Sequence, residues 1–315
     1  YKLSVVLNMV DQLTAPMGRA SQNLSSRLSG LQSGFGMAAL AGGGMTAAGV
    51  GITNGMMKIA GSTFETQDAL AELKSLGITD LKAVEDAARQ FSDTWAGTTK
   101  ADFITAAYDI KSGIASLTDE GVAQFTELAG LTAKATKSTT GEMTSLFATG
   151  YGIYKGYYSE LSDLEFGEMF AGGIATAVKA YKTSGSEMAS AISALGGTAT
   201  SANVPLEEQL SVLGMLQATM SGSEAATKYK ALLNAATGAG EKLGLNFLDA
   251  NNQLRSLPEI LGILKGKYGD TIDAVEKKQI KEAFGSDEAV AVIDLLYGKT
   301  GELQTGILDM YDALG

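Results

Sequence analysis

The 315-residue chain contains no cysteine and no histidine, and it has only three prolines and one tryptophan. Without cysteine it can form neither a disulfide framework nor a thiol nucleophile, and without histidine it has no Cys/His zinc site and no histidine-based triad. Carboxylates, lysine, tyrosine and hydroxyls remain as its chemical groups. We therefore assign no catalytic, cofactor-binding or metal-ligating residue.

Clustered positive charge is also lacking. The formal net charge is -11 and the isoelectric point is about 4.6, which argues against specific nucleic-acid binding. Residues 1–60 differ from the rest, because they hold four bases (Lys2, Arg19, Arg27 and Lys58) against the single acid Asp11. The asymmetry predicts that the two parts of the chain meet different surroundings.

The longest uncharged run is Leu28–Met57, which is rich in glycine, alanine and methionine. It is long enough to cross a bilayer as a helix, which takes about 20 apolar residues. The pairs Gly44 with Ala48 and Gly51 with Gly55 have the small-xxx-small spacing of closely packed helices. Two interpretations remain open: a hinge or buried intersubunit helix in a soluble oligomer, and a segment that inserts into a membrane after release.

Upstream of this run, residues 1–10 are predicted as a short strand, followed by a turn up to Pro16. From Met17 an amphipathic helix is expected, with a coiled-coil-like spacing of its apolar residues. Its apolar side holds Ala20, Leu24, Leu28 and Leu31, and its wet side holds Arg19, Gln22, Asn23 and Arg27. A start at Tyr1 and a helical pattern still running at Gly315 predict a piece of a longer protein.

From Ser62 onward, apolar residues recur at spacings of three and four between short loops, which predicts amphipathic helices on a shared core. Capping boxes are expected at Ser62/Glu65, Thr139/Glu142, Ser184/Glu187 and Ser256/Glu259. We predict an all-α fold, a bundle of roughly ten helices. The expected division is 1–27 (strand and helix), 28–61 (apolar segment), 62–300 (helical domain) and 301–315 (the start of a further helix).

One small β-hairpin is predicted within this domain. Alternating residues at 245–249 and 253–255 flank the turn Ala250-Asn251-Asn252. A calcium loop built on Asp249, Asn251 and Asn252 is the alternative, although it lacks the regular spacing and the closing glutamate of such loops.

Two residue groups could suggest a site. The acidic pairs Asp119–Glu120, Glu207–Glu208 and Asp287–Glu288 invite comparison with carboxylate glycosidases. All three fall at predicted helix starts, where negative charge complements the helix dipole, and this explanation suffices. The tyrosines at 151, 154, 157 and 158 are expected to form a packing or intersubunit face rather than a ligand site.

Four stretches carry a family resemblance: FETQDALAELKSLGI at Phe64–Ile78, Gly185–Met220, Leu243–Leu264, and IKEAFGSDEAVAVIDLL at Ile280–Leu296. In this order they resemble the helical domain of phage tail tape measure proteins, in the minor tail protein family. The resemblance covers roughly three quarters of the chain. The long helical ruler of such proteins is missing, so the chain would be one module of the whole protein.

The resemblance implies a non-enzymatic structural virion protein inside the tail tube or at the tail tip. Such a protein would help to set tail length, and on release at the tip it would assist DNA passage across the host envelope. The implied partners are further copies of the chain (trimer or hexamer), the tail tube protein, baseplate or tail-tip hub proteins, tail assembly chaperones and the host inner membrane. Alternatives are a membrane-inserting pore-forming protein and the tape measure of a tailocin or contractile injection system.

Overall fold

The computed structural model describes residues 64–314, and almost all of this part is helical. A helix over residues 64–75 comes first. It is followed by α4 (Leu81–Thr94), α5 (Lys100–Gly113), α6 (Asp119–Thr136), α7 (Thr140–Tyr154), α8 (Asp163–Tyr181), α9 (Gly185–Leu195), α10 (Thr198–Ser201), α11 (Leu206–Leu216), α12 (Gly222–Leu243), α13 (Leu257–Tyr268), α14 (Ala274–Phe284), α15 (Asp287–Leu296), the 3-10 turn Tyr297–Lys299 and α16 (Thr300–Leu314). The all-α prediction is confirmed.

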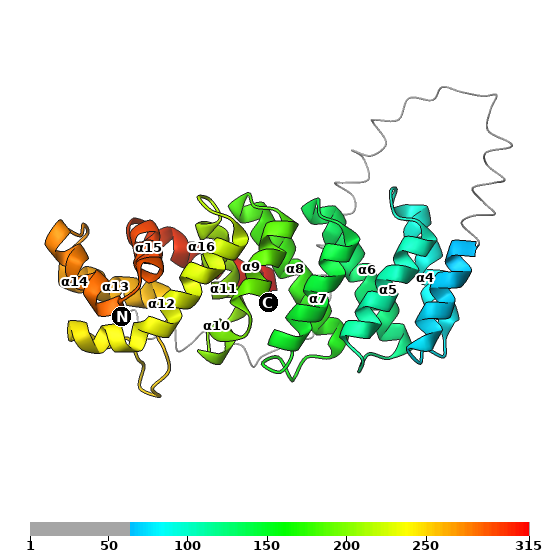
Figure 1. The fold of residues 1–315 in the computed structure, drawn as a ribbon, viewed down its shortest axis with the longest axis horizontal. Helices are drawn as coiled ribbons and strands as arrows, with labels where there is room; N and C mark the ends of the chain where they lie inside the picture. Colours follow the sequence, from blue (N-terminus) through cyan, green and yellow to red (C-terminus); the bar gives the residue numbers. More distant parts are fainter. Residues whose placement is uncertain (1–63, 315) are drawn as a thin grey trace, which may run out of the picture.

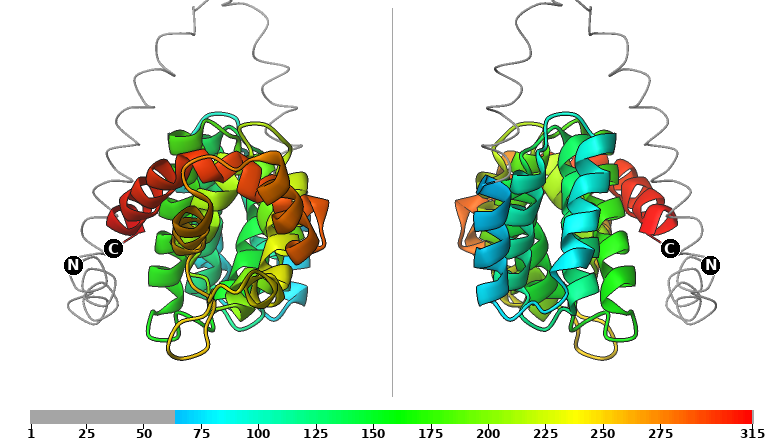
Figure 2. Two further views of the ribbon diagram at one scale, coloured as in Figure 1. Left: turned by 90° about the vertical axis from the view of Figure 1, so that its left-hand side faces the viewer. Right: turned by 90° about the vertical axis from the view of Figure 1, so that its right-hand side faces the viewer.

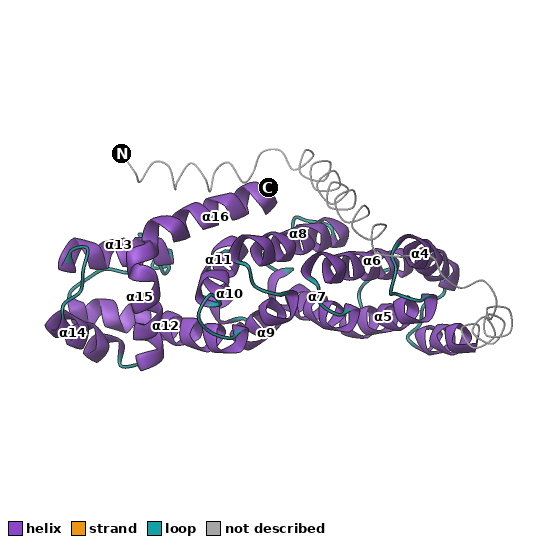
Figure 3. Cartoon of the chain, turned by 90° about the horizontal axis from the view of Figure 1, so that it is seen from above, coloured by secondary structure: helices purple, strands orange, loops and turns teal. Residues whose placement is uncertain are grey.

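The helices form an elongated body (Figure 1) that consists of two rows (Figure 3). Seen from above, α4, α6 and α8 lie in one row, while α5, α7 and α9 lie in the other and α12 continues it (Figure 3). Short loops connect the rows, so neighbouring helices run antiparallel, as in stacked helical hairpins. The buried side chains of both rows form one continuous hydrophobic core.

Sequence-encoded caps set most helix starts. Both hydrogen bonds of the predicted capping boxes are present at Thr139/Glu142 and Ser256/Glu259, where each glutamate also accepts from the backbone N–H of the cap residue. At Ser184 the hydroxyl accepts from the N–H of Glu187, but the Glu187 carboxylate accepts from the N–H of Gly222 on α12, at 2.5 Å. That box is therefore half formed, because its carboxylate binds the first residue of another helix.

The middle of the molecule is packed with aromatic rings. Phe125, Phe147, Tyr151, Phe166 and Phe170, from α6, α7 and α8, form the aromatic cluster, with ring centroids 5.4–6.3 Å apart in mostly edge-to-face geometry. Offset and edge-to-face pairs are the favoured arrangements of such rings. A Cβ atom on Gly150 would lie 2.3 Å from Cζ of Phe170, so glycine is what permits this close approach.

The predicted β-hairpin is wrong. Residues 245–255 make a single antiparallel bridge, between Leu248 and Leu254, around a turn in which the Asp249 carboxylate accepts from the N–H groups of Asn251 and Gln253. Both arms end at helix caps, because Leu245 N–H closes the end of α12 and Ser256 begins α13. No residues remain to extend a ladder.

The predictions for residues 1–63, including the strand, the amphipathic helix, the uncharged run Leu28–Met57 and the Ser62 cap, lie outside the described residues. Within residues 64–314, no helix is both long enough and apolar enough to span a membrane. The helix expected from residue 301 is α16, which lies along the outside of the two rows against α8 and α11 (Figures 2 and 3).

Candidate functional site

Helix α11 lies at the centre of the molecule and is enclosed on all sides. It packs against α8, α9, α12 and α16, and ten of its eleven residues are buried, Met215 being the exception. Four of the buried residues are polar: Glu207, Glu208, Gln209 and Ser211. Buried polar and charged groups are costly unless they are paired, so this stretch differs from the rest of the core.

The three predicted acidic pairs all occupy first turns of helices, as expected, but their surroundings differ. Near the surface, Asp119 accepts from the N–H groups of Thr79 and Asp80 at 2.9 and 2.7 Å. Exposed Asp287 pairs with Lys281 at 2.7 Å. Glu207 and Glu208, by contrast, are 5% and 3% exposed. The helix dipole alone does not explain why Glu207 and Glu208 lie at this helix start, because burial disfavours the ionised form of a carboxyl group.

Glu208 bridges two helices. Its Oε1 accepts from the backbone N–H of Leu257, the first residue of α13, at 2.7 Å. Burial raises the pKa of the Glu208 carboxyl to about 7, against the lowering effect of the Leu257 N–H, and Glu259 adds to the rise. We therefore expect this carboxyl to titrate near neutral pH in the folded protein.

Glu207 faces other neighbours. Its Oε2 is buried and accepts no hydrogen bond from any described residue. Burial also raises the pKa of this carboxyl. Burial, and after it the charge of Glu207, raises the pKa of the hydroxyls of Tyr158 and Tyr311, which lie in the loop after α7 and on α16.

The polar side chains around α11 form one layer, which we call the polar layer: Tyr154, Tyr158, Glu207, Glu208, Gln209, Tyr229 and Tyr311. Tyr154 donates to Oε1 of Gln209 at 3.0 Å, and the Gln209 amide donates to the carbonyl of Val204 at 2.8 Å. The hydroxyl of Tyr229 is buried without a hydrogen-bond partner among the described residues. Tyr154 also tilts onto Phe170, so the layer adjoins the aromatic cluster.

The tyrosine group behaves largely as a packing face. Tyr154 is buried, Tyr151 donates to Asp163 at 2.7 Å, and Tyr158 packs on Phe166. Tyr157 is 53% exposed and is the exception.

Sequence reasoning placed Glu207 and Glu208 on a helix start but missed their burial. A signal was present, since residues 209–223 contain no charged side chain. Such a run after a glutamate pair is typical of a central helix rather than of a surface one.

The carboxylates of Glu207 and Glu208 are enclosed in the core. In this structure an extended polysaccharide has no access to the two carboxylates, and no lysine or arginine of the described part pairs with either of them. No group of three acids within residues 64–314 could hold a metal ion. The Asp249 carboxylate, the centre of the alternative calcium loop, accepts from backbone N–H groups of its own turn instead.

Comparison with known proteins identifies a family for the chain. A family model described as phage-related minor tail protein matches residues 85–285, from within α4 to the residue after α14. No curated protein and no solved structure matches the chain. The matched segment contains the aromatic cluster and all of the polar layer except Tyr311.

Proposed function

The chain belongs to the phage-related minor tail protein family and has a structural role in a virion tail, and from this premise we propose that it is a module of a tail tape measure protein. In this proposal the parent protein lies in the tail tube, helps to set tail length during assembly, and leaves at the tip to assist DNA passage. The match over residues 85–285 is the observation that carries the proposal, and the order of the four similar stretches supports it.

The module itself is not the ruler. A continuous α-helix rises about 1.5 Å per residue, so a segment that measures tail length must be long and must not fold back on itself. Residues 64–314 instead fold back and forth into two rows of short helices (Figure 3). We propose that this body anchors the ruler to its partners, which are other copies of the chain, the tube protein, the tip hub proteins and, before assembly, the tail chaperones.

The experiment is a length test in the phage. An insertion of about 70 helix-forming residues after Leu314 should lengthen the tail by roughly 100 Å if the protein measures it. The matched control places the same insertion in the exposed loop at Gly269–Asp270, inside the folded module, where tail length should not change. Electron microscopy of purified tails reads both. Tails of unchanged length with the first insertion would leave a minor tail role but overturn the measuring one.

The uncharged run Leu28–Met57 motivates the second step of the proposal, membrane passage after release. Its glycines suit close helix packing in the tail, and its lack of charge would permit bilayer entry. Replacing both Gly49 and Gly51 with Asp should leave tails assembled but block DNA delivery, measured as potassium efflux and phage DNA entry. Normal infection by the Asp variant would overturn this step, and Gly49→Ala with Gly51→Ala is the control for size.

A pore-forming protein that acts alone, the second candidate, rests on the same uncharged run. Dye leakage from liposomes with the purified chain and no other phage component would favour it. The family match over residues 85–285 favours the tail protein.

A further inference from the structure

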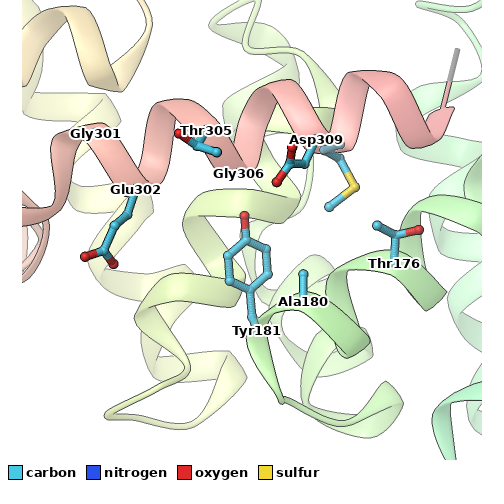
Figure 4. Close-up of a pocket in the computed structure, with 9 residues that line it drawn as sticks. Thr176, Ala180, Tyr181, Gly301, Glu302, Thr305, Gly306 and Asp309 are labelled. Atoms are coloured by element: carbon cyan, nitrogen blue, oxygen red, sulfur yellow. The ribbon is translucent and has the colours of Figure 1, made fainter.

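A groove runs along the outside of the molecule between α8 and α16. Its volume is about 470 Å³. It is lined by residues of α8 and α16, and the argument uses Ala180, Tyr181, Glu302, Gly306, Asp309 and Met310 (Figure 4). Among the lining residues, Met310 is buried and Tyr181 is half-buried, while Glu302 and Asp309 are exposed, and we call these two carboxylates the rim.

Tyr181 is held in place by glycines. A Cβ atom on Gly306 would lie 2.3 Å from the hydroxyl oxygen of Tyr181, and one on Gly214 would lie 2.2 Å from the ring. The tyrosine is therefore fixed between α11 and α16. A side chain that is already held in place loses little conformational entropy when the groove is filled.

The rim is negative and unpaired. Glu302 and Asp309 are seven residues apart on α16, roughly 10 Å along the helix. Both are exposed, and neither makes an ion pair with any residue of the described part. Helix α16 contains no lysine or arginine, and its Leu308 is 41% exposed. This surface fits an amphipathic segment with an apolar stripe and flanking basic residues.

The chain contains a segment of this description outside the described residues. Residues 17–31 hold Arg19 and Arg27 and no acid, and their apolar residues recur at helical spacing. As a helix, the segment would place the two arginines roughly 12 Å apart, close to the spacing of the two rim carboxylates. We propose that residues 17–31 dock as a helix in the groove between α8 and α16, with Arg19 and Arg27 facing Glu302 and Asp309.

The connection between this segment and Phe64 is 32 residues long. The chain between residue 31 and Phe64 spans roughly 50 Å if helical and roughly 100 Å if extended. Because the segment is tethered, its effective concentration is in the millimolar range, so a weak intrinsic affinity suffices. Exposed ion pairs stabilise little by themselves, so apolar contacts hold the segment and the charges select its site. Docking would fix the point from which the uncharged run leaves the helical body.

Because the chain has no cysteine of its own, spin labels can be attached only at cysteines that are introduced for the measurement. Spin labels are attached to the full chain at Gln22→Cys and Gln304→Cys, and electron paramagnetic resonance gives their separation. We expect one narrow distance. Arg19→Glu with Arg27→Glu should broaden it, and Glu302→Arg with Asp309→Arg should do the same. The four changes together should restore the narrow distance, which general unfolding would not.

Controls separate the groove from overall charge and from other occupants. Asp93→Arg with Glu241→Arg removes two exposed acids outside the groove and should leave the distance narrow. Ala180→Trp fills the groove from an exposed position and should broaden it, with the circular dichroism spectrum unchanged. A broad distance in the unmodified background, or a narrow one that survives Ala180→Trp, would overturn the proposal. A distance seen only between separately labelled chains would assign the groove to a second copy and overturn it too.

Discussion

The aromatic cluster and the polar layer are adjacent parts of one core, but they are stabilised in different ways. In the cluster, rings from α6, α7 and α8 pack edge to face, and glycines admit them closely. In the polar layer, two carboxylates without cations are enclosed around α11. Tyr154 belongs to both, since its ring lies on Phe170 and its hydroxyl bonds to Gln209.

The two regions therefore differ in how their contributions to stability depend on pH. Apolar packing is insensitive to pH, whereas a buried carboxyl with a raised pKa stabilises the fold only while it holds its proton. A tail protein of this kind must persist in the particle and, in the proposal above, rearrange on release. The aromatic cluster suits a protein that must stay folded in the particle. The polar layer is the region where a rearrangement on release could start.

The largest effect is expected in the aromatic cluster. Phe170→Ala should lower the free energy of unfolding by about 3–5 kcal/mol, because the ring is fully buried against Phe147 and Phe166. Urea denaturation followed by circular dichroism measures this. Tyr157→Ala, at a 53% exposed position, should change it by less than about 0.5 kcal/mol. Similar losses in both variants would contradict the view that the cluster holds the fold.

The second-largest effect is expected in the polar layer, and it depends on pH. The folded pKa of Glu208 lies above its unfolded value of 4.5, so its contribution to stability falls as pH rises from about 4.5 through about 7. Glu208→Gln keeps an acceptor for Leu257 N–H without the charge. Relative to the unmodified protein, it should gain up to about 3 kcal/mol at pH 8 and almost nothing at pH 4.

Denaturation curves across this pH range give the measurement. The matched control is Glu120→Gln, which removes a carboxylate from an exposed first-turn position. Equal pH dependence for Glu208→Gln and the unmodified protein would mean that the carboxyl is not what makes the layer responsive.

The helix starts of the fold could be predicted from the sequence, but hydrogen bonds between distant residues could not. Helix starts followed from local chemistry, as at Thr139 and Ser256, because a cap needs only residues three apart in sequence. The Glu187 carboxylate accepts a hydrogen bond from the N–H of Gly222, 35 residues away, instead of from its own cap residue. No rule based on neighbouring residues predicts this partner. The hairpin failed for the same reason, since the helix caps on either side left its arms no room.

The candidate site shows where sequence reasoning stops. That Glu207 and Glu208 start a helix was visible, but their burial depends on α13 and α16, which arrive 50 to 100 residues later in the chain. The pairs at Asp119 and Asp287 have the same local pattern and remain near the surface. Apart from the uncharged run that follows Glu207 and Glu208, only packing distinguishes the three pairs.

A smaller effect tests how tightly the cluster is closed. Gly150→Ala should cost about 1–3 kcal/mol, because the new methyl group would lie 2.3 Å from the Phe170 ring. Gly152→Ala, two residues later in α7, meets nothing within 4 Å and should instead stabilise the helix by up to about 1 kcal/mol. The same denaturation assay reads both, and equal signs would show that the rings can move aside.

The smallest effect should run opposite to that of Glu208. Hydrogen bonds from Asp80 and Thr79 hold the pKa of Asp119 below its usual value, so this carboxylate stabilises the fold above about pH 4, and its contribution is lost as pH falls. Asp119→Asn should cost about 0.5–1 kcal/mol at pH 7, the size of a lost helix cap, and less at pH 3. Thermal unfolding at the two pH values measures the change. A cost that grows toward pH 3 would give Asp119 the same sign as Glu208, and the distinction between the surface pair and the buried pair would then fail.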